Sequence, residues 1–386
     1  MRPTAADVAA ARPAVEEIAK RTPVLSSRTF SERTGGRVLL KAENLQRTGS
    51  FKVRGAAAKL HALGDGCARG VVCASAGNHG QGVAAAAAAR GVRCDVFVPD
   101  DAPIAKYEAI MGQGAHVHRG GPLIEECLAA ALAHATEHEL AFVHPYDDPD
   151  VIAGQGSIGL ELVEDVPDLA AVVVPVGGGG LASGIALAVR AARPDVRVVG
   201  VQVVDSTLTI ADGIAVKRPG EVTRPLLDEW LDEVVTVGED EIAEAMFLCL
   251  ERAKLVVEGA GAAGVAALLS GSVQPAERGA TVAILSGGNV DAGLLAATAR
   301  RHETEAGRRL VLFTKLRDRP GALVALLQHV ADTGANIVDV SHVREGVDLH
   351  VRETAVELVL ETRGREHADG VIADLTDAGY EARVLR

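Results

Sequence analysis

The chain has 386 residues, of which 42 are glycine, and its 39 Lys and Arg stand against 52 Asp and Glu, a formal net charge of −13. A negative balance of this size argues against nucleic acid as the main partner. Apolar residues make up 48% of the chain, which excludes a disordered protein, and the glycines lack the three-residue period of collagen. The excess glycine is therefore expected in specific loops.

The termini, the apolar runs and the cysteines predict a cytoplasmic protein. The first residues, MRPTAADVAA, contain Asp7 and no apolar core, so no signal peptide is expected. The uncharged run 169–189 has the length of a membrane span, but Pro175 and four glycines in its middle favour a strand, a loop and a helix. The cysteines form no CxxC pair, which is typical of reduced core thiols: Cys67, Cys73, Cys94, Cys127 and Cys249.

Up to about residue 300, short β-branched runs alternate with alanine-rich stretches. Strands are predicted at 38–42, 70–73, 94–98, 115–118, 171–176, 196–201 and 280–285. Helices are predicted at 52–62, 79–90, 122–138, 181–192, 239–253 and 260–269. This alternation predicts an α/β fold with parallel sheets and helices on both faces. Such sheets bind ligands at the carboxyl ends of their strands, where three of the glycine clusters lie.

A charged and polar segment at 297–309 predicts a domain boundary, and the tail beyond it has another pattern. The expected order is strand 309–316, helix 320–333, strand 335–343, strand 353–361, helix 365–378 and strand 380–385. Asp318, Pro320 and Gly321 form the first strand-to-helix turn, with the proline near the start of the helix. The tail is thus predicted to be a βαββαβ unit.

The segment TGSFKVRGA, residues 48–56, places Lys52 at the predicted start of a helix, beside Phe51. Desolvation next to an aromatic ring, near a helix N-terminus, lowers the pKa of a lysine and leaves a free amine. A free amine can form a Schiff base with a carbonyl cofactor. Taken alone, a surface lysine on an amphipathic helix is the commoner explanation.

Three further motifs follow predicted strands. SAGNHGQG, residues 75–82, sets Asn78 between glycines in a turn that suits a carboxylate or phenolate oxygen, although an Asx turn capping the helix explains it equally well. VPVGGGGLASG, residues 174–184, forms a nest of N–H donors suited to phosphate, without the lysine of a P-loop. SGGN, residues 286–289, offers Ser286 as a partner for a ring nitrogen.

Two other patterns in the sequence do not indicate a binding site. GQGSIG at 154–159 and GAGAAG at 259–264 match the dinucleotide pattern GxGxxG, but the strand after the second ends in Ser286 and glycines instead of the acidic residue that NAD requires. His116 and His118 share a face of a strand with no acidic residue nearby in the sequence, and there is no HExxH motif or Cys/His cluster. No metal site is therefore predicted.

Together these motifs supply the attachment points of pyridoxal 5'-phosphate, and the chain resembles the threonine dehydratases (threonine ammonia-lyases) of the fold-type II pyridoxal-phosphate enzymes. The segments that carry the resemblance are 40–56, 75–84, 144–161, 174–181, 211–220 and 284–291. It implies a tryptophan synthase β-like catalytic domain over 1–305, with a small subdomain, about 48–147, inserted in a large one of 1–47 and 148–305. DRPGAL at 318–323 and TGANI at 333–337 resemble an ACT domain, an amino-acid-sensing module, over 309–386.

The resemblance also implies roles for individual residues. Lys52 holds the cofactor and then acts as the base at Cα, Phe51 packs near the ring, Asn78 binds the phenolic oxygen and Ser286 faces the pyridine nitrogen. The backbone N–H groups expected to bind the phosphate belong to Gly177, Gly178, Gly179, Gly180 and Leu181. The substrate carboxylate is expected at Ser75, Ala76, Gly77, Asn78 and His79.

The implied reaction is β-elimination, because a serine at the ring nitrogen leaves the ring a weaker electron sink than a carboxylate would. L-Threonine gives 2-oxobutanoate and ammonia, and L-serine gives pyruvate. A dehydratase for another β-hydroxy amino acid, serine or 3-hydroxyaspartate, stays open, as does a non-catalytic amino-acid sensor.

Two departures from related serine racemases refine this expectation. Ala76 stands where the racemases carry a serine that acts as a base on the opposite ring face, so dehydration without racemisation is predicted. Gln202 stands where they carry a carboxylate that binds a divalent metal, which puts that site in doubt.

The tail is predicted to regulate the enzyme by binding an amino acid near Asp318 to Leu323. Isoleucine or valine is the natural effector of a biosynthetic enzyme of this kind. Because ACT modules usually work in pairs, a homodimer or homotetramer is expected.

Overall fold

The computed structural model describes residues 2–204, 209–215, 219–344 and 349–385. Residues 216–218, part of the segment 211–220 that carries the resemblance, lie outside them. The chain forms two compact units, Met1–Asp291 and Ala292–Arg386. Helix α12 (Ala292–Glu305) belongs to the second unit, so the division lies before this helix rather than at its end. The polar stretch at 297–309 reflects the exposure of α12, in which only Thr298 is buried, and not a linker.

The larger sheet of the first unit has the strand order β1-β2-β10-β7-β8-β9. Its strands are β1 (Val24–Ser26), β2 (Val38–Lys41), β7 (Leu169–Pro175), β8 (Arg197–Val203), β9 (Glu233–Val237) and β10 (Ala280–Ile284). All neighbours pair in parallel except β1 with β2. The sequence predicted the four central strands and missed the edge strands: β1 is short and only partly buried, and β9 is mostly exposed, so neither has a buried apolar run.

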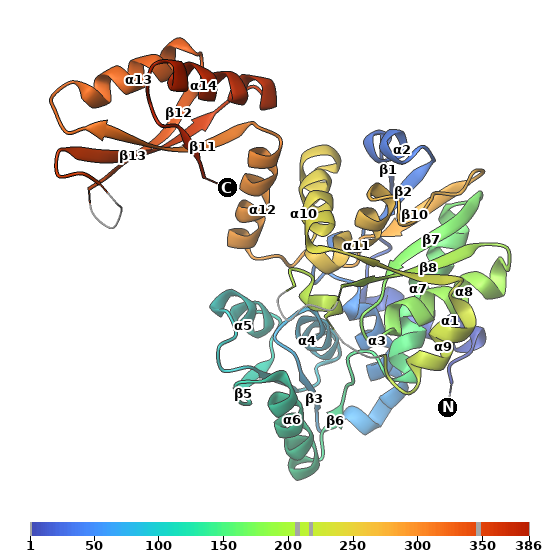
Figure 1. Ribbon diagram of the computed structural model, residues 1–386. Helices are drawn as coiled ribbons and strands as arrows, with labels where there is room; N and C mark the ends of the chain where they lie inside the picture. The colour runs from blue at the N-terminus through green and yellow to red at the C-terminus, as the bar shows by residue number, and fades with distance from the viewer. Residues whose placement is uncertain (1, 205–208, 216–218, 345–348, 386) are drawn as a thin grey trace. The chain divides into compact units, whose positions relative to one another are not determined.

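Helices cover both faces of this sheet (Figure 1). Val172 and Val174 of β7 pack in one cluster with Ile185 of α8 (Gly180–Ala192). Val173 lies instead against Gly264 of α11 (Gly259–Leu269). Because successive side chains of a strand point to opposite faces, α8 and α11 lie on opposite sides of the sheet, and the predicted architecture is confirmed.

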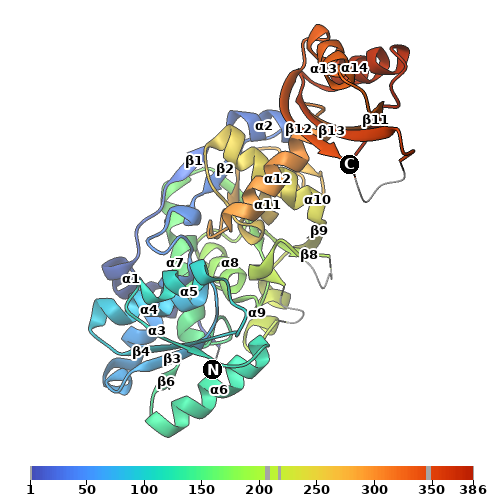
Figure 2. The ribbon, with the colours of Figure 1, turned by 90° about the vertical axis from the view of Figure 1, so that its left-hand side faces the viewer.

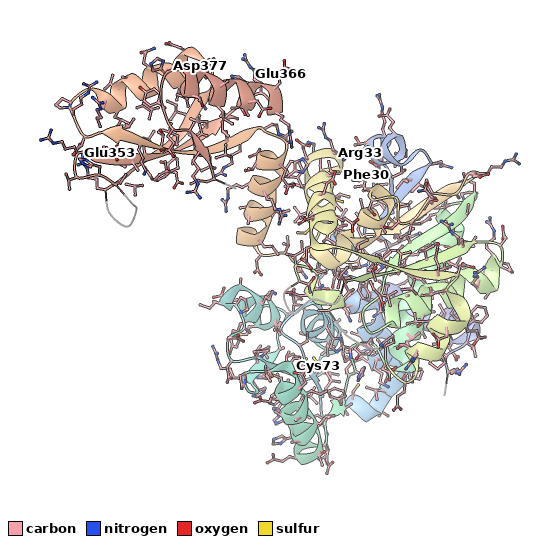
Figure 3. All side chains as sticks on the ribbon, in the orientation of Figure 1. Phe30, Arg33, Cys73, Glu353, Glu366 and Asp377 are labelled. Carbon is pink, nitrogen blue, oxygen red and sulfur yellow. The ribbon has the colours of Figure 1, made fainter. Side chains whose placement is uncertain are left out.

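The smaller sheet, entirely parallel, has the order β5-β4-β3-β6. Its strands are β3 (Val71–Ala74), β4 (Cys94–Val98), β5 (His116–Arg119) and β6 (Ala141–Phe142). One face packs on α6 (Ile124–His138) and the other on α3 (Lys52–Leu63) and α4 (Asn78–Arg90). Figure 2 shows this sheet from the side. Cys73 of β3 lies inside the unit (Figure 3), and all five cysteines are free and buried.

The remaining helices of the first unit are α1 (Ala5–Ile18), α2 (Arg28–Thr34), α5 (Ile104–Met111), α7 (Pro149–Asp165), α9 (Thr223–Trp230) and α10 (Glu239–Leu248). A π-helical turn at Cys249–Ala253 extends α10 to the predicted end of this helix. The run 169–189 forms β7, the glycine loop and α8. Within the described ranges, no helix combines the length and the apolar character needed to cross a membrane.

The motif GQGSIG lies in the middle of α7, not in a loop. A Cβ on Gly154 would come within 2.6 Å of the Arg54 carbonyl oxygen of α3. On Gly156 and Gly159 it would come within 2.9 Å and 2.8 Å of carbonyl oxygens of α8. These glycines let three helix backbones pack against one another, so the expectation that the excess glycine lies in loops is wrong for α7.

The second unit contains β11 (Arg309–Arg317), α13 (Ala322–Asp332), β12 (Asn336–Val343), β13 (Glu353–Glu361), α14 (Arg365–Asp377) and β14 (Arg383–Val384). The sheet order is β12-β13-β11-β14, with antiparallel pairing throughout. Leu312 of β11, Leu326 of α13 and Val371 of α14 belong to one buried cluster. The predicted βαββαβ pattern is confirmed, with a last strand shorter than expected.

Candidate active site

Lys52 is the first residue of α3, and two contacts fix the start of this helix at the end of β10. Ser50 forms an isolated bridge with Gly287, and the Phe51 N–H donates to the Ser286 carbonyl oxygen at 3.1 Å. The lysine motif and the SGGN motif therefore lie side by side. This is the edge of the sheet at which parallel strands present their carboxyl ends.

The Lys52 side chain is half-buried, and its Nζ donates to the Pro145 carbonyl oxygen at 2.9 Å. The Nζ lies 5.2 Å from the centroid of the Phe51 ring. Desolvation lowers the pKa of Lys52 to about 8, against the opposing attraction of the Glu258 carboxylate. Near neutral pH a useful fraction of such a lysine is a free amine, so it can attack a carbonyl carbon.

Asn78 begins α4, and both ends of its amide are held by other side chains. Its Nδ2 donates to Glu258 Oε1 at 2.7 Å, and its Oδ1 accepts from Asn289 Nδ2 at 2.7 Å. Asn289 also donates to the Thr48 carbonyl oxygen at 2.8 Å. The helix cap is Gly77, without a side-chain hydrogen bond, so the alternative in which Asn78 caps the helix is wrong. One N–H of the amide is left to donate to a ligand.

Glu258 was not predicted as a functional residue. Desolvation raises the pKa of its carboxyl group to about 7, with the Asn78 hydrogen bond acting in the opposite direction. Its backbone N–H donates to the Gly287 carbonyl oxygen at 3.0 Å. In the sequence it precedes GAGAAG as an ordinary residue before a helix, and nothing nearby points to Asn78, 180 positions earlier.

The glycine loop joins β7 to α8 and is closely packed. Gly179 has φ +93°, and a Cβ on Gly177 would lie 2.9 Å from Ile214 Cα. A Cβ on Gly178 would overlap the Tyr146 ring. The first N–H groups of α8 have no acceptor within the helix, and they point along its positive dipole end. Such a loop suits a phosphate group.

The segment that follows β6 connects the glycine loop with Lys52. Pro145 accepts the Lys52 hydrogen bond, and the next residue, Tyr146, covers Gly178. Asp147 accepts hydrogen bonds from Val222 and Thr223 at the start of α9, at 2.9 Å and 3.0 Å. The segment 144–161 is one of those that carry the resemblance, but its pattern indicates no role for Tyr146 or Asp147. Their function depends on contacts with residues far away in the chain.

The loop 75–79 forms the turn from β3 into α4. Ser75 Oγ accepts a hydrogen bond from the Gly77 N–H at 3.1 Å. His79 Nε2 is hydrogen-bonded to the Val143 carbonyl oxygen at 2.9 Å. Burial lowers the pKa of His79 to about 3, so its ring is neutral. Ala76 packs against the small-sheet core. The N–H groups at the start of α4 can receive a carboxylate here.

These residues fit pyridoxal 5'-phosphate, which needs an amine for its carbonyl carbon, a donor for its phenolic oxygen and a phosphate site. Two orphaned hydroxyl groups support the fit. Among the described residues, Thr48 Oγ1 and Ser50 Oγ are buried without a hydrogen-bond partner, next to Lys52 in the chain. Buried polar atoms rarely lack partners, so this pair is consistent with hydrogen bonds to a group that binds beside Lys52.

Comparisons with known proteins give relatives that match nearly the whole chain. The chain is 43% identical to an L-threonine ammonia-lyase of Thermotoga maritima over 99% of both chains. It is 45% identical to one of Geobacter sulfurreducens, covering 95% of this chain and 96% of the relative.

Solved structures are similar over about three quarters of the chain. Maize serine racemase has a TM-score of 0.74 at 33% identity and covers 79% of this chain and 99% of its own. Serine racemase of Dictyostelium discoideum has a TM-score of 0.71 at 38% identity, and the match covers 75% of this chain and 99% of the racemase chain. The family model "Pyridoxal-phosphate dependent enzyme" matches residues 15–287. The chain therefore belongs to the family of pyridoxal-phosphate dependent enzymes.

Proposed function

We propose that the protein is a threonine ammonia-lyase, which converts L-threonine to 2-oxobutanoate and ammonia, and L-serine to pyruvate as a second reaction. The observation that carries this proposal is the connected set of Lys52, Asn78 and the glycine loop. The set lies in a chain that matches L-threonine ammonia-lyase over nearly its full length. The test is release of 2-oxobutanoate from L-threonine by the purified protein.

The bound cofactor supplies an electron sink for the bond that breaks at Cα. Lys52 takes the proton from Cα, a role that suits an amine whose pKa of about 8 lies near the working pH. The loop 75–79 orients the substrate through its carboxylate, and Asn78 and Ser286 orient the ring. Loss of the β-hydroxyl as water leaves an enamine product, which tautomerises and hydrolyses in solution to the 2-oxo acid and ammonia.

The pKa of Lys52 predicts how cofactor capture depends on pH. The rate at which apoenzyme attaches pyridoxal 5'-phosphate should rise about tenfold per pH unit below pH 8 and level off above it, because only the neutral amine reacts. Stopped-flow absorbance between pH 6.5 and 10 measures this rate.

Glu258→Gln is the matched variant for this experiment. Because the Glu258 carboxylate raises the pKa of Lys52, its removal should move the levelling point to lower pH. A rate that keeps rising to pH 10, as for an exposed lysine, would contradict the assignment of Lys52.

Ala76 predicts a second property, the absence of racemisation. The purified holoenzyme should form no D-serine from L-serine, because an alanine cannot move a proton on the opposite ring face. Chiral chromatography of a reaction with L-serine, run beside pyruvate release, measures both outcomes. The Ala76→Ser variant is the matched comparison and should gain a D-serine signal. D-Serine formed by the unaltered protein would refute the prediction.

Substrate preference is the part of this proposal that the pocket decides least. One methyl group separates threonine from serine. Such a group changes the activation free energy that determines kcat/KM by only about 1–3 kcal/mol. Relative kcat/KM for L-threonine, L-serine and 3-hydroxyaspartate discriminates a threonine enzyme from the other dehydratases. Absence of any 2-oxo acid with all three would favour the non-catalytic sensor.

The second unit acts, in this proposal, as an ACT domain that binds an amino acid at the turn after β11. A cavity of about 300 Å³ lies there, lined by residues that include Asp318, Leu323 and Arg344. Arg344 and Asp318 form an ion pair at 2.9 Å, and α13 begins at Ala322 with free N–H donors. The cavity thus offers partners for an ammonium, a carboxylate and an apolar side chain.

Effector binding is tested with the full chain, which we expect to form a homodimer or homotetramer. Titration calorimetry should detect binding of isoleucine or valine, and Asp318→Asn should weaken it roughly tenfold or more, because a charged hydrogen bond is lost. Asp339→Asn, an exposed carboxylate of β12, is the control and should bind normally. No heat with either amino acid, or equal effects of the two variants, would overturn this assignment.

A further inference from the structure

A carboxylate and two imidazoles meet on the small sheet, outside the site described above. Asp95 of β4, His118 of β5 and His134 of α6 each offer one ligand atom, and these atoms lie within 4.8 Å of one another. The sequence predicted no metal site because His118 has no acidic neighbour in the chain. The fold supplies one from the adjacent strand.

The register of the sheet explains why these three side chains lie close together. Phe97 of β4 pairs with His118 of β5, and Asp95 lies two residues before Phe97, on the same face. This face packs on α6, since Phe97 clusters with Cys127 and Ala131. His134, one turn after Ala131 on that helix, therefore reaches the same place.

The polar atoms of this cluster are incompletely partnered. Asp95 is fully buried, and its Oδ1 accepts from His118 Nε2 at 2.7 Å. Among the described residues, His134 Nε2 is buried without a hydrogen-bond partner, and it lies 3.7 Å from Asp95 Oδ2. An unpartnered imidazole nitrogen beside a buried carboxylate indicates a group that both would contact.

The surroundings favour a metal ion in one respect and oppose it in another. His138 follows His134 by one helical turn, with ring centroids 4.2 Å apart, and its half-exposed ring can turn toward the cluster as a further ligand. Arg93 Nε lies 2.7 Å from Asp95 Oδ2, and its positive charge opposes a cation there. The Arg93 side chain is 48% exposed, so it can move into solvent.

We propose that Asp95, His118 and His134 bind one divalent transition-metal ion, with His138 or water as the fourth ligand. Two histidines and a carboxylate in a closed arrangement suit Zn²⁺. Tetrahedral ligands about 2.0–2.1 Å from zinc stand roughly 3.3 Å apart. The 3.7 Å between Asp95 and His134 needs a small adjustment, and the set as a whole, spread over up to 4.8 Å, must contract around the ion. The ion would hold α6 to β4 and β5, a structural role rather than a catalytic one.

The test uses the full-length holoenzyme after treatment with a chelator, titrated with Zn²⁺ in a calorimeter. The expected result is one ion per chain with micromolar or tighter affinity. His134→Asn should weaken binding at least a hundredfold, whereas His116→Asn, on the same strand but outside the ligand set, should leave it unchanged. Arg93→Gln should tighten binding several-fold, because it removes the opposing charge.

Equal Zn²⁺ binding by the unaltered chain and by His134→Asn would overturn the proposal, as would no binding by the unaltered chain. Circular dichroism checks that the variants fold. A second measurement needs no variant: crystals soaked in Zn²⁺ should give an anomalous peak within bonding distance of His134 Nε2, and a peak only elsewhere would also overturn it.

Discussion

Lys52→Ala should lower kcat/KM for L-threonine by at least about 10³-fold, because one side chain attaches the cofactor and moves the Cα proton. The visible absorbance of the bound cofactor should be lost together with activity. Lys59→Ala is the matched control on the same helix. Its ammonium pairs with Asp148 at 2.7 Å and Asp150 at 3.0 Å, at the edge of the site, so this variant should keep cofactor and most activity.

The two variants separate a chemical role from a structural one. If Lys52→Ala kept its 2-oxobutanoate release, the proposed function of this site would be wrong. If Lys52→Ala and Lys59→Ala lost activity equally, with intact cofactor absorbance in both, the lysine would matter for folding of α3 and not for chemistry.

Arg54→Met should give the largest loss of stability, about 3–5 kcal/mol in the free energy of unfolding. Arg54 is 1% exposed, and its guanidinium donates to Glu43 at 2.8 Å and 2.9 Å and to Glu161 at 2.6 Å. Lys41 completes this buried cluster through Glu161 at 2.5 Å. Two carboxylates and two cations balance, so removal of Arg54 leaves a buried negative charge without compensation.

Urea unfolding, followed by circular dichroism, measures this effect. Arg28→Met is the control, because Arg28 and Glu32 form an exposed pair at 2.7 Å and such pairs contribute little. An unfolding midpoint of Arg54→Met equal to that of the unaltered protein would contradict the interpretation of the cluster as balanced and buried. The unfolding midpoint of Arg54→Lys should lie between those of Arg54→Met and the unaltered protein, because lysine keeps the charge and loses the bidentate hydrogen bonds.

The sequence predicted the parts of the fold that depend on local pattern. The buried β-branched runs indicated the central strands, and glycine clusters after them indicated the loops at which Lys52, Asn78 and Gly178 are found. The edge strand β9 was missed, because its five residues EVVTV are mostly exposed and too few to form a buried apolar run. The tail pattern was also predicted, since its strands bury alternate residues on α13 and α14.

What the sequence did not predict depends on contacts between distant residues. Glu258 becomes part of the site through Asn78, and Asp95 becomes a partner of His118 through the register of two strands. The six-residue pattern in α7 matched a nucleotide loop only because a pattern of glycines does not distinguish a turn from a close helix crossing. Packing, and not spacing, decides between these two uses of glycine.

The close crossing of α7 with α3 and α8 also fixes the size of the molecule that the site accepts. A Cβ would come within 2.6 Å of the Arg54 carbonyl oxygen at Gly154 and within 2.9 Å of the Gly184 carbonyl oxygen at Gly156, so the helix backbones pack closely there. Helix α3 carries the amine at its first residue and α8 begins at the glycine loop, so the close packing of both helices on α7 ties the two anchoring points to each other. The spacing between amine and phosphate is therefore set by the helices, and a cofactor analogue with a phosphate arm one methylene longer should be excluded.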